Sequence, residues 1–558
     1  MSKSKRFKRE STTFEYLPNE ICVEIFSYLN GVDTVYAFSL LNLRFQSLIN
    51  NYVDIFNFKS ISKKKFCFVI QHHNIQRWRS LCLSNNDDTP GQIKLFCQLF
   101  PSTEDIDQLQ SLTKLQSLTI LNAQDKDAEK FLLKTSSFNN FVSLSIENVC
   151  GFNIQSINLP TLQQLTLTSC KHTSWIMNCS SLKSLEYTIA DNCTHDHELV
   201  FPKTLTRFKM YYNQYSNEID FRKLLRQMPN LKMLALFDKA TYSKMPDGKY
   251  WEELIKSSLS LLKTFQFYFP YNQSSVSLRD SKAMIESFST PFYLLEKRWF
   301  VRCDRSAEYS QEGSLYSLPF AFSELLINTS SYKTSISTLP VDDINQIKSN
   351  YYKKINTLKV NRALAEPPIY LLPSNIIRLT LNVILPKSWL YLLKELRYLH
   401  IEYHADMSSN DFAQLLEHTP NLQSLVVSTE KLKKFTDDFQ HKIVCQYLSE
   451  RIKSLTITDS DYNYNRSNLG DVSIDALSSL ARIFSSKCEH LSLGIMANPN
   501  TVRSILQRMT QLRSLRIELR GRDTVSNWLQ KQSTYSTALD FVHINKKQNF
   551  FVWFGNRC

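Results

Sequence analysis

One short phrase recurs along most of this chain: an apolar residue, two variable residues, an apolar residue, one variable residue and a final apolar residue. Copies begin at Leu115, Phe141, Leu162, Leu182, Leu205, Leu231, Leu262, Ile355, Ile376, Leu396, Leu422, Ile452 and Leu512. The alternation of apolar and variable positions is typical of a β-strand with one buried face. The first six copies start 26, 21, 20, 23 and 26 residues apart, so the sequence predicts many short strands at repeat-like spacing.

Several of these strands are expected to follow a helix. Asp220 can cap a helix over Phe221–Met228 that ends just before the copy at Leu231, and a helix over Asp411–His418 precedes another copy. A third helix is expected to begin at Thr501. A unit made of a helix, a turn and a strand can bury its apolar faces only against neighbouring units, and a solenoid is built in this way.

This unit resembles an irregular leucine-rich repeat, and the resemblance implies an α/β fold in which repeats stack into a horseshoe. It implies one array of such repeats over residues 105–270, a second array over 355–530 and a C-terminal cap over 531–558. The phrase is absent from residues 271–354, which are either a long insertion or diverged repeats, with candidate strands at Trp299–Cys303 and Ala321–Ile327. The alternative is a mixed α/β body in which the phrase recurs by coincidence.

Residues 14–58 have a different pattern, which predicts three short apolar helices. The first, over Asn19–Leu29, places on one face the residues Ile21, Ile25 and Leu29. Asp33 is the expected cap of the second helix, and the third is expected over Leu43–Asn50. Three helices of this size form only a marginal core by themselves, so we expect part of their apolar surface to be covered from outside.

In order and spacing this stretch resembles an F-box. The matching segments are Leu17-Pro18-x-Glu20-Ile21, Glu24-Ile25-Phe26-x-x-Leu29 and Leu43-Arg44-Phe45-x-x-Leu48, with Phe45 where many F-boxes have Trp. The resemblance implies that residues 14–58 bind the Skp-type adaptor of a cullin–RING ubiquitin ligase. The residues implied in this contact or its immediate support are Leu17, Pro18, Ile21, Ile25, Phe26 and Leu29. Residues 59–104, with an expected strand at Arg79–Leu83, would connect the F-box to the repeats.

Charge and composition indicate in which cellular compartment the protein is expected. Residues 1–13 are basic and predicted to be disordered, and the whole chain carries 66 Lys plus Arg against 52 Asp plus Glu, a net charge of +14. The N-terminus lacks the apolar stretch of a secretory signal, and the 12 cysteines show no dense spacing. We therefore expect an intracellular protein, cytoplasmic, nuclear or both, with reduced thiols and no membrane span.

The motifs of common enzyme classes are absent, and the chain is predicted not to be an enzyme and to need no cofactor. Only 9 glycines occur in 558 residues, which disfavours Gly-rich phosphate loops. Cys193, His195 and His197 are the one compact group of potential metal ligands, but the remaining ligands of a closed zinc site are missing at typical spacing. An exposed loop is the better interpretation of that group.

In each strand phrase the variable positions should face outward from the buried core. On the concave face of the proposed horseshoe these positions predict a target-binding stripe made of Thr119, Ser145, Thr166, Glu186, Lys209, Lys359, Thr380, His400 and Arg516. The stripe is polar with several cations, which suits an acidic or polar protein surface.

Three classes of function follow from these features. The first is a non-enzymatic substrate receptor of an SCF-type ubiquitin ligase, with an unknown protein target. The second is a leucine-rich-repeat scaffold without a ligase role. The third is a nucleic-acid binder that uses the basic charge, although no nucleic-acid-binding signature is present.

Overall fold

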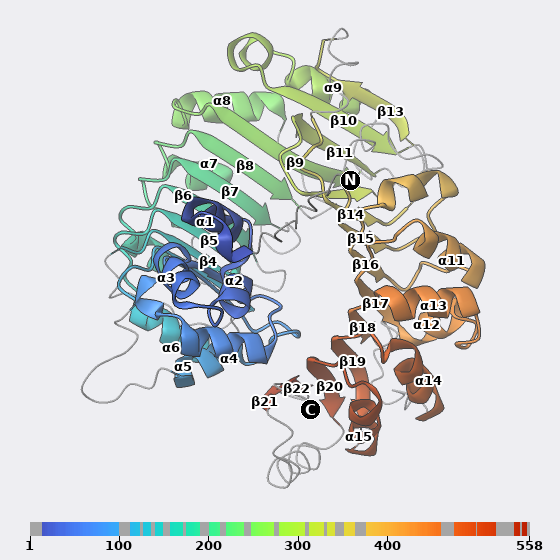
Figure 1. Cartoon of the computed structure of the whole chain (residues 1–558). Helices are drawn as coiled ribbons and strands as arrows, with labels where there is room; N and C mark the ends of the chain where they lie inside the picture. The colour runs from blue at the N-terminus through green and yellow to red at the C-terminus, as the bar shows by residue number, and fades with distance from the viewer. Residues whose placement is uncertain are drawn as a thin grey trace, which may run out of the picture.

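The computed structural model describes most of the chain. The described ranges are residues 14–99, 112–122, 126–135, 140–148, 157–170, 174–189, 200–212, 219–238, 247–272, 278–306, 312–327, 332–340, 351–362, 375–458, 474–497, 499–519, 541–546 and 549–554. The basic tail over residues 1–13 and the group Cys193, His195 and His197 lie outside these ranges. The fold is mixed α/β, with helices at the N-terminus followed by two large sheets that are mostly parallel (Figure 1).

The N-terminal helices are α1 (Asn19–Ser27), α2 (Gly31–Phe38) and α3 (Leu43–Tyr52), which confirms three helices at the expected places. They pack around an aromatic cluster of Phe14, Phe26, Phe38 and Phe45, whose ring centroids lie 5.2–6.4 Å apart. Phe45 is fully buried there. Aromatic pairs at such distances contribute beyond their buried area, so a Phe closes this small core at the position of the expected Trp.

The predicted cap of α2 was wrong. Asn30, not Asp33, precedes the helix, and its side-chain oxygen accepts a hydrogen bond from the Val32 N–H at 3.3 Å. Asp33 lies in the first turn and instead pairs with Lys65 on α4 (Lys63–His72), with 2.6 Å between the two charged atoms. Asn is as good a cap as Asp, and Asn30 has the extended backbone that a cap requires.

The first sheet has twelve strands in the order β1-β2-β3-β4-β5-β6-β7-β8-β9-β11-β10-β13. Its parallel strands are β1 (Ile55–Asn57), β2 (Ser80–Ser84), β3 (Ser117–Leu121), β4 (Ser143–Ile146), β5 (Gln164–Cys170), β6 (Ser184–Ile189), β7 (Arg207–Tyr212), β8 (Met233–Asp238) and β9 (Thr264–Asn272). Successive strands are neighbours in chain order. The predicted strand at Arg79–Leu83 is confirmed as β2.

Burial follows the repeated phrase. Strand β6 alternates half-buried and buried residues along its whole length, and β4 does the same. The apolar positions, such as Leu118 and Ile120 on β3, are fully buried. Alternation in the sequence thus becomes a buried face and a polar face, as a strand requires.

Helices cover the outer side of each sheet, while the strands line the inner side (Figure 1). Over the first sheet these helices are α5 (Gln92–Leu99), α6 (Lys126–Thr135), α7 (Phe221–Arg226), α8 (Gly248–Ser258) and α9 (Leu278–Ser287). Asp220 caps α7 as predicted, accepting a hydrogen bond from the Lys223 N–H at 3.1 Å.

Residues 271–354 end the first sheet and begin the second. Strands β10 (Phe300–Ser306), β11 (Glu312–Leu318) and β13 (Tyr332–Ser337) extend the first sheet by antiparallel pairing. Strand β12 (Glu324–Ile327) instead pairs in parallel with β14 (Thr357–Val360) of the second sheet. Both predicted strands in this region are present. The interpretation that the phrase is absent here was wrong for β12, because Phe322, Leu325 and Ile327 form a further copy of it on a parallel strand.

The second sheet has ten strands in the order β12-β14-β15-β16-β17-β18-β19-β20-β22-β21. The strands after β14 are β15 (Arg378–Leu381), β16 (Tyr398–Ile401), β17 (Ser424–Ser428), β18 (Ser454–Thr458), β19 (His490–Ala497), β20 (Ser514–Leu519), β21 (Phe541–Lys546) and β22 (Asn549–Phe554). Strands β12 to β20 are parallel, and the β21–β22 hairpin closes the sheet by antiparallel pairing.

The outer helices of the second sheet are α11 (Ser409–Glu417), α12 (Thr429–Phe435), α13 (Lys442–Arg451), α14 (Ile474–Phe484) and α15 (Pro499–Arg508). Two predicted starts need correction. Ser408 caps α11, and Asp411 completes a capping box from inside the helix. Helix α15 begins at Pro499, two residues before the predicted Thr501, at a position where proline is favoured.

A side chain immediately before several copies of the phrase joins each unit to the preceding one. Thr161 donates to the carbonyl of Phe141 at 2.8 Å, and Thr204 donates to that of Leu182 at 2.8 Å. Asn230 and Asn421 make the equivalent bonds to Lys203 and Lys394, both at 3.0 Å. These bonds satisfy backbone carbonyls in the turns between units, which supports the regular stacking.

The last strands of the second sheet contact the N-terminal part of the first sheet and its helices. Trp553 on β22 packs against Phe66 on α4, with ring centroids 5.6 Å apart. Arg516 on β20 pairs with Asp87, which follows β2, and the two charged atoms are 2.8 Å apart. The sheets therefore curve far enough for the last strands to contact the first.

Candidate protein-interaction surfaces

The N-terminal helices expose an unusual amount of apolar surface. Among the described residues eighteen large apolar side chains are exposed, and nine of them lie between residues 14 and 58. We call these nine the N-terminal apolar surface: Tyr16, Ile21, Tyr28, Leu29, Leu40, Leu41, Leu43, Tyr52 and Ile55. Single exposed apolar residues are ordinary, but nine of them within 45 residues are an unusual concentration.

The six predicted adaptor residues divide into an exposed and a supporting group. Ile21 and Leu29 are 41% and 42% exposed, and Pro18 is exposed at the start of α1. Ile25 and Leu17 are half-buried, and Phe26 is buried in the aromatic cluster. The first group is open to a partner, whereas Phe26 holds the helices together.

Sequence reasoning missed the most exposed members of this surface. Leu40, Leu41 and Leu43, in and beside the turn between α2 and α3, are 70%, 53% and 82% exposed, and Tyr16 and Tyr28 are about as open. The available signal was a run of leucines in a turn, where polar residues are usual.

Arg44 fixes the segment that leads into α1. Its guanidinium donates to the carbonyl of Glu15 at 2.6 Å, to the carbonyl of Leu17 and to the side-chain oxygen of Asn19 at 2.8 Å. Hydrogen bonds from a charged donor are stronger than neutral ones. Arg44 therefore holds Leu17 and Pro18 beside α3 and orders this part of the apolar surface.

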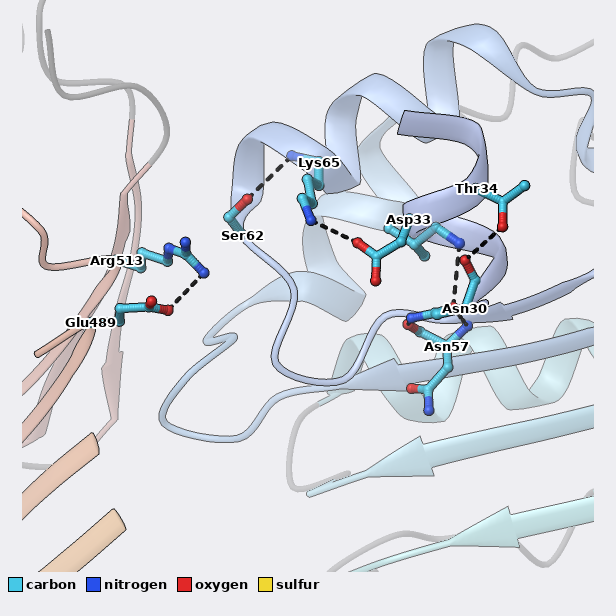
Figure 2. Close-up of polar contacts among 9 residues, drawn as sticks. Asn30, Asp33, Thr34, Asn57, Ser62, Lys65, Glu489 and Arg513 are labelled. Carbon is cyan, nitrogen blue, oxygen red and sulfur yellow. Dashed lines mark hydrogen bonds and ion pairs between the residues drawn. The ribbon is translucent and has the colours of Figure 1, made fainter. Parts of the chain in front are cut away.

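A polar joint attaches the helices to the first sheet, as Figure 2 shows. Asn30 donates from its side chain to the carbonyl of Asn57 on β1 at 2.9 Å, while Asp33 pairs with Lys65. At the end of α4, Trp78 donates a hydrogen bond to Nδ1 of the buried His73 at 2.9 Å. Burial lowers the pKa of His73, so the ring accepts this bond as the neutral species.

The register of the strands places all nine predicted stripe residues in two rows. Across the first sheet Thr119, Ser145, Thr166, Glu186 and Lys209 are successive partners on β3 to β7. Across the second sheet the row begins with Lys359, Thr380 and His400 and ends at Arg516. All nine are half-buried on the inner side of the strands.

Several of the charged residues in these rows are already paired. Lys209 lies 3.2 Å from Glu186 and over the ring of Tyr211. Burial disfavours its charged form, but Tyr211 and Glu186 outweigh this and raise the pKa of Lys209. Lys359 pairs with Glu402 at 2.8 Å, and Arg516 pairs with Asp87. These contacts reduce the charge that the rows offer to a partner.

A hollow of about 770 Å³ lies where the two ends of the chain face each other. One wall comes from the N-terminal part of the first sheet and includes Lys59, Asp87 and Asp88. The other wall comes from the starts of strands β15 to β20, including the segments 453–456 and 489–492. Figure 2 shows Glu489 and Arg513 opposite the N-terminal elements. A volume of this size suits a ligand of several residues.

Three of the described thiols are poor candidates for chemistry. Burial raises the pKa of Cys82 to about 11 and that of Cys179 and Cys488 to about 12. A thiolate is the reactive form, so these groups are inert near neutral pH.

Within the described ranges no cluster of three or more His, Cys, Asp and Glu side chains is arranged to hold a metal ion. None of the described helices has the length and apolar character needed to cross a bilayer.

No protein-family model matches the chain, and no curated protein sequence matches it.

Proposed function

We propose that this chain is an F-box protein whose remaining residues form an irregular leucine-rich-repeat solenoid. In this proposal it is the substrate-recognition subunit of an SCF-type ubiquitin ligase. Residues 14–58 bind a Skp-type adaptor, and through it the cullin, while the inner side of the sheets holds a protein target. The chain supplies no reacting group. It acts by raising the effective concentration of target lysines near a ubiquitin-carrying enzyme.

The observation that carries the proposal is the N-terminal apolar surface. Half of the exposed large apolar residues among those described fall within residues 14–58. Burying one such side chain gains about 1.5–3 kcal/mol, so covering several of them is enough to drive a specific association. The spacing of Leu17, Pro18 and Ile21 in the sequence supports an adaptor as the covering molecule.

The repeat interpretation is supported by strand order. The parallel strands follow one another in chain order in both sheets, helices lie on the outer side, and side chains such as Thr161 join adjacent units. A solenoid has these features because each unit contacts only its neighbours.

A scaffold without a ligase role is the second candidate, favoured by the polar rows and the hollow. These features suit protein binding whether or not an adaptor is present. Adaptor capture separates the two candidates, because a scaffold has no reason to bind a Skp-type protein.

The test is capture of a purified Skp-type adaptor by the full-length chain. The informative variant is Ile21→Asp with Leu29→Asp, since both side chains are exposed and their replacement leaves the buried core intact. We expect this variant to lose capture by about 100-fold or more, because two carboxylates would be desolvated in an apolar contact.

The matched control is Leu261→Asp with Leu295→Asp, two leucines that are 48% and 76% exposed on the body of the protein. We expect this pair to leave capture unchanged. Failure of the wild-type chain to capture the adaptor, or equal loss in both double variants, would contradict the F-box assignment.

A further inference from the structure

Three cations on one wall of the hollow have no acidic partner. Arg378, Arg397 and Lys453 line the hollow at the starts of β15, β16 and β18, and all three are exposed. Among the residues the structure describes, none of the three makes an ion pair. Glu489, which lines the same wall, is instead paired with the neighbouring Arg513 at 2.7 Å. This wall therefore has positive charge available to a ligand.

The register fixes the spacing of these cations. Arg378 is paired with Tyr398 across β15 and β16, Tyr398 with Ser424, and Ser424 with Ser454. Arg397 and Lys453 directly precede Tyr398 and Ser454, so the three cations cover three strand-to-strand steps, or about 14 Å. An extended peptide spans this distance with roughly four or five residues.

Uncharged polar groups lie between the cations. Gln423, Ser424 and Ser454 are on the same wall, and Asn86, Asn122 and Asn148 are on the opposite one. Amide and hydroxyl side chains can bond the N–H and C=O groups of an extended chain. The hollow thus combines groups suited to a peptide backbone with cations suited to acidic side chains.

A nucleic acid fits this hollow less well. Asp87, Asp88 and Glu489 are also on its walls, and they would repel a ligand that carries a charge at every step. The ring of Tyr398 is already covered by Arg378, whose guanidinium carbon is 5.2 Å from the ring centroid. A base that stacked on this side of the Tyr398 ring would have to displace the guanidinium.

We infer that the hollow binds an extended acidic segment of a partner protein, whose carboxylates pair with Arg378, Arg397 and Lys453. The inference rests on the part of the proposed function in which the body holds a protein target. It assigns that role to residues at the strand starts, outside the predicted stripe, and it needs no contact with an adaptor.

The test measures binding of a fluorescent peptide in which Glu and Ser alternate over about 12 residues, long enough to cross the hollow. The comparison peptide has Gln in place of Glu, and an oligouridylate of the same number of units tests nucleic acid. The variant is the full chain with Arg378→Gln, Arg397→Gln and Lys453→Gln. We expect about tenfold weaker binding of the Glu peptide by this triple variant.

The chain offers a closely matched control. Lys183, Lys232 and Lys263 are exposed residues that directly precede β6, β8 and β9 on the first sheet. Lys183 and Lys453 make the same backbone bond to the preceding unit, at 2.9 and 2.8 Å. Replacing these three lysines by Gln removes the same charge outside the hollow, and we expect less than about a twofold change in binding.

Equal weakening in the two triple variants would overturn the inference, because binding would then depend on net charge alone. Absence of binding to the Glu peptide, or tighter binding of the oligouridylate with the same dependence on Arg378, would also overturn it. A photoreactive Glu peptide cross-linked to the wild-type chain gives a measurement that needs no variant. We expect its cross-links in segments 453–456 and 489–492, and cross-links elsewhere would contradict the assignment.

Adaptor capture by the same triple variant separates this inference from the F-box assignment. Unchanged capture with weakened peptide binding supports both. Peptide binding that depends on the hollow, in a chain that captures no adaptor, would support the inference and contradict the F-box assignment. Adaptor capture by a chain that does not bind the Glu peptide would support the F-box assignment and contradict the inference.

Discussion

The N-terminal helices and the inner sides of the sheets expose opposite kinds of side chain. Residues 14–58 leave nine large apolar side chains open, whereas the strand rows present Thr, Ser, Glu, Lys, His and Arg. The strands alternate, so each apolar residue reaches the core shared with the outer helices. The three short helices pack Phe14, Phe26 and Phe45 against one another and join the core of the first sheet through residues such as Val32 and Ile49, yet the nine apolar side chains stay exposed. The difference teaches that the two parts of the chain present surfaces of different chemistry, which the proposed function assigns to two different partners.

The largest expected effect is on the aromatic cluster of the helices. Phe45→Ala removes a fully buried ring that contacts Phe14, Phe26 and Phe38, and we expect it to destabilise this region by about 3–5 kcal/mol. Limited proteolysis should cut within residues 14–58 and leave the sheets intact. The control is Leu43→Ala on the same helix, 82% exposed, with an expected change within about 0.5 kcal/mol. Equal sensitivity of the two variants would mean that the helices have no core of their own.

The next largest loss of stability is expected at the buried polar cluster of Asp304, Arg302 and Tyr316. Asp304 is 1% exposed and accepts hydrogen bonds from Arg302 at 2.9 Å and from Tyr316 at 2.6 Å. Asp304→Ala leaves a largely buried guanidinium without this partner, so we expect a loss of about 3 kcal/mol in chemical denaturation. Asp406→Asn, at an exposed pair with Lys434, is the control and should have no measurable effect. A stable Asp304→Ala variant would show that this junction does not depend on the cluster.

The contact between the chain ends has a smaller expected effect. A double-mutant cycle of Asp87→Asn and Arg516→Gln should give a coupling of about 0.2–1 kcal/mol, because both groups are partly exposed. The coupling should decrease as salt is added. A coupling of zero at low salt would mean that the ends do not meet in solution.

Stability should depend on pH through His73, which directly follows α4, and this is the smallest of the expected effects. Burial lowers the pKa of His73 below its value of 6.5 in the unfolded chain, so unfolding takes up a proton below pH 6.5. The contribution of neutral His73 is complete above that pH and decreases as the pH falls toward the folded pKa. Melting curves should show a smaller acid-induced decrease for His73→Gln, whose amide keeps an acceptor for Trp78 without titrating. An unchanged decrease would exclude His73 as the titrating group.

The sequence predicted the strands well because the phrase itself encodes a buried face. Leu118, Ile120, Leu185 and Tyr187 are buried where the alternation placed them, and the rows from Thr119 to Lys209 follow from the same spacing. Cap residues were less predictable, since Asn30 and Asp33 are both good caps and only the structure shows which one has the extended backbone.

Features that join distant segments were not predictable from the sequence. Asp87 and Arg516 meet only because small rotations between many strands add up to a curve that brings the ends together. Arg378, Arg397 and Lys453 precede strands far apart in the sequence, and they share a wall only through register. The spacing of apolar residues does not distinguish the antiparallel strands between 300 and 337 from the parallel ones, so their place at the end of the first sheet was not predicted.

The most direct test of the central claim is hydrogen–deuterium exchange of the full-length chain, alone and saturated with a Skp-type adaptor. If the N-terminal apolar surface is the adaptor contact, amides in α1 and in the turn between α2 and α3 will exchange more slowly in the complex. Strands β14 to β20 will be unchanged. Protection confined to the sheets, or none within residues 14–58, would contradict the claim.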